Sequence, residues 1–226
     1  TFFPQLVAGP IVRAGDLISQ FYEEKRATIN QFIWGTFLLT IGLFQKVVLA
    51  DTLLSDTSDQ VFGAKGVLSW LDAWTGTLAF SGQIFFDFAG YSTCAIGIAL
   101  MLGIILPDNF RYPYAAIGFS DLWRRWHISL STWLKDYLYI PLGGNKRGSM
   151  ASYIILSIIL IGVVIAFKNF VVLITITSIV LIIFILSQYI STFKNYINTN
   201  INLLLTMLIG GLWHGASWKF VIWGGL

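Results

Sequence analysis

The chain has 226 residues, of which 56% are hydrophobic and only 11% are charged, and its formal net charge is +3. Soluble domains carry about 25% charged residues, so this chain has too few polar groups to cover a water-soluble globule. The composition excludes a disordered chain, a disulfide-stapled secreted domain and an ordinary soluble enzyme. It predicts an all-α, polytopic protein embedded in a lipid bilayer.

The ends, the cysteine and the charge distribution set further limits. The chain begins at Thr1 without an initiating Met and stops inside an apolar run at Leu226, so we expect an internal fragment. The single cysteine, Cys94, excludes an internal disulfide and a cysteine-based zinc site. Residues 107–148 carry six Lys or Arg against three acids, which predicts a cytoplasmic segment. In so apolar a chain we expect no nucleic-acid surface.

The first elements follow from polarity and length. Residues 13–30 are polar and predict a surface helix or loop. Residues 33–50 are apolar and, at about 1.5 Å per residue, nearly long enough to cross a hydrocarbon core of about 30 Å. Residues 51–66 contain three Asp and predict a loop on the outer side.

The apolar run 67–106 is long enough for two spans, 67–86 and 88–106, with a break near Asp87 and Gly90. Two crossings would place the following basic segment on the outer side, in conflict with its charge. We therefore expect one of the two segments to be tilted, re-entrant or only partly inserted.

Residues 121–138 have apolar side chains at steps of three and four, which predicts an amphipathic helix. The stripe consists of Leu122, Trp126, Leu130, Trp133 and Tyr137. Ser120 or Asp121 is expected to cap the N-terminus of this helix, and its tryptophans favour the membrane interface.

Two more apolar runs, 151–167 and 171–190, predict a transmembrane hairpin, and residues 201–226 form a last apolar run. No internal repeat or soluble linker separates these parts. We expect residues 1–226 to form a single membrane-embedded domain.

His214 is the most informative residue. It lies 13 residues after Ile201, about 20 Å along a helix, so it lies well inside the membrane if that run spans it. Ionisable groups at such depth are costly and by default face a cavity or pathway. Glycines at 210, 211 and 215 permit a broken helix and the close approach of a substrate. The alternative is a structural histidine bonded to a neighbouring helix.

His127 is the second of only two histidines. It is expected at the edge of the amphipathic stripe, near Arg124 and Ser131. The alternative is an interfacial histidine at the headgroup level. Neither histidine has a carboxylate beside it in sequence, so no metal site is predicted.

Two further features invite a role. Asp87 is an acid within an apolar run, where it pairs with a cation, caps a broken helix or has a function. The loop at 141–148, Pro-Leu-Gly-Gly-Asn-Lys-Arg-Gly, could cradle an anion through backbone N–H groups and two cations, or form a plain turn.

Four stretches together resemble the membrane-bound O-acyltransferases, and among them the bacterial alginate O-acetylation type. They are FPQLVAGPI at 3–11, FDFAGYS at 86–92, DLWRRWHISLS at 121–131 continued by DYLYIPLGGN at 136–145, and GLWHGA at 211–216. Each is weak alone, but their order along the chain is specific.

The resemblance implies a polytopic helical fold with an amphipathic or re-entrant helix near the cytoplasmic face of a bacterial inner membrane. It implies that His214 is catalytic, deep in a tunnel, and that His127 is also important. The donor would be a cytoplasmic acyl thioester, here acetyl-CoA, with no bound cofactor. The acetyl group would cross the membrane to an extracytoplasmic SGNH-type acetyltransferase, which would complete transfer to a polysaccharide acceptor such as alginate.

The sequence departs from the family in two places. Relatives join the Gly-Gly-Asn loop to the Trp-His-Gly segment more directly, so we expect an extra transmembrane hairpin at 151–190. Two extra crossings would leave His214 on its usual side. Thr93 and Cys94 stand where relatives often carry an acid.

The residues suit acyl transfer. A neutral imidazole can take the proton of a hydroxyl as it attacks a thioester, and a covalent acyl-imidazole is the other possibility. The expected donor-binding residues are Arg124, Arg125, Asn145, Lys146 and Arg147, of which the four cations would attract the phosphates of coenzyme A. The alternatives are D-alanyl transfer to teichoic acid, a transporter or channel with a histidine relay, and a non-catalytic scaffold.

Overall fold

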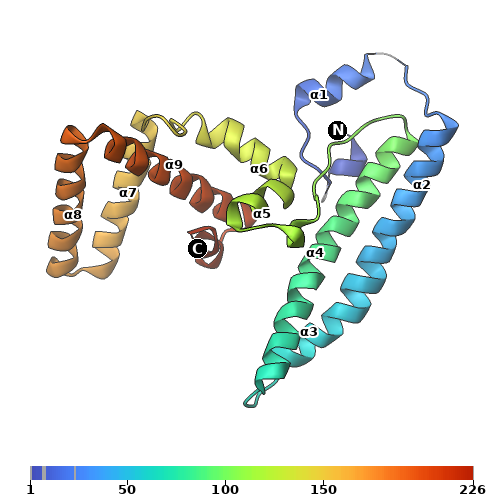
Figure 1. The fold of residues 1–226 in the computed structure, drawn as a ribbon, viewed down its shortest axis with the longest axis horizontal. Coiled ribbons are helices and arrows are strands. Elements are labelled where there is room, and N and C mark those ends of the chain that lie inside the picture. The colour runs from blue at the N-terminus through green and yellow to red at the C-terminus, as the bar shows by residue number, and fades with distance from the viewer. Residues whose placement is uncertain (1, 7–8, 23, 226) are drawn as a thin grey trace. The chain divides into compact units, whose positions relative to one another are not determined.

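The computed structural model describes residues 2–6, 9–22 and 24–225, and every regular element in these ranges is a helix (Figure 1). This confirms the all-α prediction. The chain folds into two compact units, Thr1–Ser131 and Thr132–Leu226.

The first unit begins with short helices on its surface. Helix α1 (Ala14–Ile18) lies between two 3₁₀ turns, Phe3–Gln5 and Ser19–Phe21. The amide of Gln20 is bonded in both directions to the backbone of Ile105, donating at 3.0 Å and accepting at 2.9 Å. This pair attaches the polar N-terminal segment to the chain beyond the main hairpin.

A long helical hairpin forms the body of the first unit. Helix α2 (Ile29–Leu43), the π-helical segment η3 (Phe44–Leu54) and α3 (Ser55–Phe62) continue one another, and α4 (Trp70–Met101) returns alongside them (Figure 1). The prediction of a loop at 51–66 is therefore wrong for residues 51–62, because the chain stays helical through all three Asp residues.

The break expected near Asp87 and Gly90 is wrong, because α4 runs through both residues without interruption. This helix has 32 residues. A Cβ at Gly90 would lie 2.8 Å from the carbonyl oxygen of Gly42, and one at Gly97 would lie 2.6 Å from that of Gly35. These glycines allow two helix backbones to approach closely, so they serve packing rather than a break. With one helix instead of two, the conflict with the basic segment disappears.

The amphipathic helix expected at 121–138 is divided into three parts. They are α5 (Phe119–Arg125), α6 (Ile128–Leu134) and the π-helical segment η5 (Lys135–Tyr139). The predicted stripe is divided by the break: Leu130 is buried after it, whereas Trp133 and Tyr137 are exposed. The break falls at His127, whose backbone is left-handed.

The start of α5 also differs from the prediction. The N-cap residue is Gly118, at φ 81, and Ser120 and Asp121 lie inside the helix. The Asp121 carboxylate accepts the N–H of Ile117 at 3.1 Å, so it bonds back to the preceding turn instead of capping the helix that follows.

After η5 and the loop that follows it, the second unit contains α7 (Met150–Phe167), α8 (Phe170–Tyr189), α9 (Ser191–His214) and α10 (Trp218–Gly225). Helices α7 and α8 coincide with the two apolar runs seen in the sequence. The run 201–226 is not one helix, because the chain leaves α9 directly after His214.

In the described part of the chain, four helical runs are long and apolar enough to cross a bilayer. They are Ile29–Phe62, Trp70–Met101, Met150–Phe167 and Phe170–Tyr189, with mean hydropathies of 1.7, 1.6, 2.7 and 3.0. Most side chains of α7 and α8 are exposed, and most of the exposed ones are apolar, as expected for helices that face lipid.

Candidate active site

His127 occupies a strained turn between α5 and α6. Its φ of 44° is left-handed, which costs an L-residue about 1–2 kcal/mol, although histidine is among the residues found there most often. Only 5% of the residue is exposed, and its ring meets Phe88 of α4 edge-on at a centroid distance of 4.6 Å. The expected place on the edge of one interfacial helix is therefore corrected: the break buries the residue within the first unit.

Aromatic side chains fix this turn against α4. Phe110 meets both Phe88 and Trp126 at 5.2 Å, and Phe85 meets Trp126 at 5.9 Å. Such pairs contribute about 0.5–1.5 kcal/mol each beyond their buried area. The aromatic residues on either side of Asp87 therefore hold the break in place.

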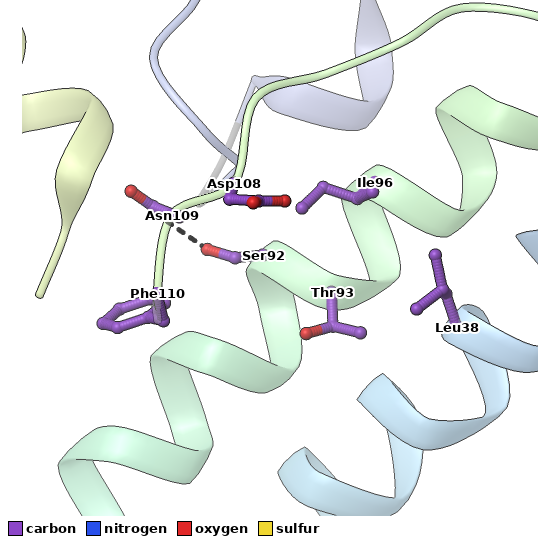
Figure 2. A pocket seen from close by; sticks show the side chains of 7 residues that line it. All are labelled: Leu38, Ser92, Thr93, Ile96, Asp108, Asn109 and Phe110. Carbon is purple, nitrogen blue, oxygen red and sulfur yellow. Dashed lines mark hydrogen bonds between the residues drawn. The ribbon is translucent and has the colours of Figure 1, made fainter. Parts of the chain in front are cut away.

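A buried polar network lies on the other side of the turn. The side-chain amide of Asn109 donates to Ser92 Oγ at 2.9 Å, as Figure 2 shows. The Oδ1 atom of Asn109 accepts from Ser129 Oγ at 2.9 Å and from the Ser129 N–H at 3.3 Å. The Ile11 N–H donates to Ser129 Oγ at 2.9 Å. Ser92, Asn109 and Ser129 are all buried.

These contacts join three of the four stretches that carry the family resemblance. Ile11 belongs to the first, Phe88 and Ser92 to the second, and Ser129 to the third. Val7 and Ala8, in the first stretch, lie outside the described residues. Residues that are far apart in sequence thus meet around His127.

Asp87 belongs to a cluster of charges near the middle of the hairpin. The Lys46 ammonium lies 2.5 Å from Asp51 Oδ1 and 2.7 Å from Asp87 Oδ1, and 5.5 Å from the centre of the Tyr91 ring. The π-helical segment η3 brings residues five apart onto one face, which allows Lys46 to reach Asp51. Of the alternatives considered for Asp87, the structure therefore shows an ion pair with Lys46, and Asp87 does not cap a broken helix.

A pocket of about 190 Å³ opens beside the polar network, as shown in Figure 2. It is lined by Leu38, Ser92, Thr93, Ile96, Asp108, Asn109 and Phe110. Ligand pockets typically measure about 300–1,000 Å³, so this one is too small to hold a coenzyme.

The two arginines of the third stretch differ in their surroundings. Arg124 is exposed, whereas Arg125 Nε donates to Asp121 Oδ2 at 2.9 Å. The hydrogen bond from Arg125, together with the backbone N–H of Ile117, lowers the pKa of Asp121 below its ordinary value. Arg124 is therefore the more available of the two for an anionic ligand.

His214 is the last residue of α9, and its ring is exposed within this chain. Two tryptophan rings flank it edge-on at 5.1 Å, those of Trp213 and of Trp223 in α10. A Cβ at Gly211 would overlap the carbonyl oxygen of Phe220, so this glycine permits the close contact of α9 and α10. Gly211, one turn before the histidine, thus brings Trp223 within reach of the imidazole.

The loop at 141–148 is attached to α9 through its carbonyl groups. The side-chain amide of Asn202 donates to the carbonyl oxygens of Gly144 at 2.9 Å and Arg147 at 3.0 Å, and Asn202 is fully buried. Thr199 Oγ1 donates to the carbonyl oxygen of Asn145, whose side chain accepts from the Tyr139 hydroxyl. Asn145 therefore has structural partners.

The backbone N–H groups of this loop are largely used within it. Those of Gly143 and Gly144 bond to the carbonyl oxygens of Ile140 and Tyr139 at 3.0 Å. Those of Lys146 and Arg147 bond more weakly, at 3.4 Å, to the carbonyl oxygen of Gly143. The anticipated cradle of free N–H groups is therefore not formed, and the exposed side chains of Lys146 and Arg147 are what the loop offers to an anion.

The predicted residues fall into two groups. The first unit contains Asp87, Arg124, Arg125 and His127, and the second contains Asn145, Lys146, Arg147 and His214. Sequence reasoning missed Asn109, Lys46 and Asn202, whose roles depend on partners far along the chain. The only local signal was the placement of a polar Asn109 between Pro107 and Pro113. Among the described residues, no three or more His, Cys, Asp or Glu are grouped so as to hold a metal ion.

Comparison with known proteins identifies related sequences. Residues 1–160 match the profile of MBOAT, the membrane-bound O-acyltransferase family. A probable alginate O-acetylase of Pseudomonas putida is 39% identical over 98% of this chain and 36% of its own length. A peptidoglycan O-acetyltransferase of Helicobacter pylori is 39% identical over 99% of the chain and 34% of its own length.

A more distant relative is a teichoic acid D-alanyltransferase of Streptococcus thermophilus, 25% identical over 99% of this chain and 45% of its own length. The chain spans about a third of the length of the O-acetylating relatives. The family match covers well over half of the chain and contains the residues that meet around His127. The chain therefore belongs to the membrane-bound O-acyltransferase family.

Proposed function

We propose that the protein moves an acetyl group from acetyl-CoA on the cytoplasmic side of a bacterial inner membrane to the other side, for O-acetylation of a polysaccharide such as alginate. The observation that carries this proposal is the convergence of three family stretches on a buried, strained His127. Residues in strained backbone conformations cluster at functional sites. The O-acetylating relatives, at 39% identity, support acetyl transfer.

In this proposal His214 acts as the general base. It takes the proton of the attacking hydroxyl while that oxygen bonds to the thioester carbonyl carbon. The C–S bond then breaks, and the imidazolium returns the proton to the departing thiolate. The products are an O-acetyl ester and free coenzyme A. His127 acts as a second residue required for the transfer, as the family resemblance implies.

Four cations are proposed to hold the donor. Arg124 and Arg125 in the first unit, and Lys146 and Arg147 in the second, would bind the phosphates of coenzyme A. Replacing all four with Gln is expected to raise the KM for acetyl-CoA at least tenfold. The matched control replaces Lys65 and Lys168 with Gln; both are exposed and lie outside the basic segment 107–148. An unchanged KM in the fourfold variant would contradict this part of the proposal.

The acceptor side is proposed to need a partner. A hydroxyl of an extracytoplasmic SGNH-type acetyltransferase takes the acetyl group and passes it to the polysaccharide. The four apolar helical runs support a position of the chain within the bilayer, between the donor and this partner.

The test uses the protein, expressed together with its SGNH-type partner, in inside-out membrane vesicles that enclose the polysaccharide and receive labelled acetyl-CoA from outside. Wild type is expected to deposit ester-linked label in the vesicle lumen. His214→Ala and His127→Ala are each expected to lower this rate at least a hundredfold while membrane insertion, measured by immunoblot, is unchanged. Normal transfer by His214→Ala would overturn the proposal. Label that crosses without forming an ester would indicate a transporter.

A second candidate is D-alanyl transfer, favoured by the match to the teichoic acid D-alanyltransferase. Labelled D-alanyl carrier-protein thioester, supplied in place of acetyl-CoA, separates the two. Transfer from that donor alone would replace acetyl transfer as the activity.

A further inference from the structure

We propose that Asn109 is a positioning residue for His127, because it caps α6 from outside the helix and so fixes the turn that carries the imidazole. This inference rests on the proposed function, in which His127 takes part in acyl transfer.

The first two N–H groups of α6 both donate hydrogen bonds to Asn109. The N–H of Ile128 donates to the carbonyl oxygen of Asn109 at 2.9 Å, and that of Ser129 donates to Asn109 Oδ1 at 3.3 Å. The first N–H groups of a helix have no partner within it and need an acceptor. That acceptor usually belongs to the residue at the N-cap, whose backbone is extended. Here the residue at that place is His127, whose backbone is left-handed, and Asn109 supplies the acceptors instead.

The orientation of the Asn109 amide is determined at both ends. Its oxygen accepts from Ser129 and its nitrogen donates to Ser92 at 2.9 Å. Asn109 is 1% exposed and Ser92 is 2% exposed. A buried polar group that loses its partner costs about 1–3 kcal/mol, and a rotated amide would turn its own NH2 group toward the Ser129 N–H and lose its bond to Ser92. The amide therefore links α6 to α4 in one geometry.

Both constraints on His127 originate on one face of α4. Phe88, which meets the imidazole ring edge-on at 4.6 Å, and Ser92, which bonds Asn109, are separated by one helical turn. Phe88 therefore limits the ring from one side, while Asn109 holds the two residues that follow it. A displacement of about 1 Å at a reacting group can lower a rate a hundredfold, so removal of this cap is expected to act on the chemical step.

The test measures acetyl transfer by the protein in membrane vesicles at varied acetyl-CoA concentration. Asn109→Ala is expected to lower kcat about ten- to hundredfold while the KM for acetyl-CoA changes less than twofold. In a His127→Ala background, the same substitution is expected to lower the residual rate less than twofold, because the group that it positions is gone. Ser58→Ala, a buried serine of α3 in the same unit, is the control and is expected to leave kcat unchanged.

Two variants keep the test open if Asn109→Ala fails to insert. Asn109→Asp keeps the acceptor oxygen for Ser129, and Ser92→Ala removes only the bond to α4. Each is expected to lower kcat about three- to tenfold, again without a further effect in the His127→Ala background. Losses that multiply with His127→Ala, or that appear in KM, would show a merely structural role and overturn this inference. A His127→Ala variant with full activity would instead overturn the proposed role of His127 itself.

Discussion

The two histidines are held in different ways by their own units. His127 is 5% exposed and is surrounded by aromatic rings and a buried hydrogen-bond network that connects three distant segments. His214 is exposed, and two tryptophan rings and a close contact between α9 and α10 define its place. Several independent contacts within its unit thus hold His127 in place, whereas the position of His214 depends on the single contact between α9 and α10. One substitution should therefore displace His214 more readily than His127.

The largest expected effect tests that helix contact. Gly211→Val would drive side-chain atoms into the backbone of Phe220 and move Trp223 away from His214. Acetyl transfer is expected to fall at least a hundredfold, measured with labelled acetyl-CoA. Gly162→Val, in α7, is the matched control because a Cβ there meets no atom within 4 Å. Normal activity of Gly211→Val would show that His214 does not depend on this contact.

The next effect concerns the stability of the hairpin that carries the His127 site. Lys46→Met leaves Asp51 and Asp87, each nearly half exposed, without their shared cation, and the loss is expected to cost about 1 kcal/mol. The thermal midpoint of the detergent-solubilised protein should fall by a few degrees. Adding Asp87→Asn to Lys46→Met should restore part of it. Lys194→Met, an exposed lysine in α9, should have no effect, and an equal loss there would contradict a specific role of the cluster.

An effect of similar size separates donor binding from chemistry. Asn202→Leu removes two hydrogen bonds, worth about 1 kcal/mol each, that attach the loop at 141–148 to α9. The KM for acetyl-CoA is expected to rise about tenfold while kcat stays within twofold. Asn200→Leu, on an exposed part of the same helix, is the control. A loss of kcat instead would show that the loop at 141–148 affects the chemical step rather than donor binding.

The smallest effect is on pH dependence. The hydrogen bond from Arg125 lowers the pKa of Asp121 in the folded protein. The stabilisation is therefore present above the unfolded pKa, about 3.9, and is lost as pH falls through the lower folded value. Asp121→Asn should remove this part of the acid-side loss, seen as a shallower fall of the thermal midpoint below about pH 4. An unchanged slope would show that the pair of Asp121 and Arg125 does not contribute.

The sequence predicted much of the fold, since long apolar runs and their polar ends determine where helices lie. It failed where a residue acts through distant partners. Gly90 suggested a break, but it lies against the backbone of α2. The stripe from Leu122 to Tyr137 suggested one helix, because residue spacing alone does not reveal the change of direction at a left-handed residue. The left-handed turn at His127 depends on Asn109, and no local periodicity reveals a cap supplied from another segment.

The length of α4 has a consequence for how the acyl donor enters. Phe88, and with it His127, lies 13 residues before the end of this helix at Met101, about 20 Å along its axis. If α4 crosses the lipid, the imidazole is nearer the centre of the bilayer than its surface. Arg124 and Arg125 lie three and two residues before that imidazole in the chain, so phosphates bound by these arginines would require a water-filled entrance that reaches nearly to the same depth.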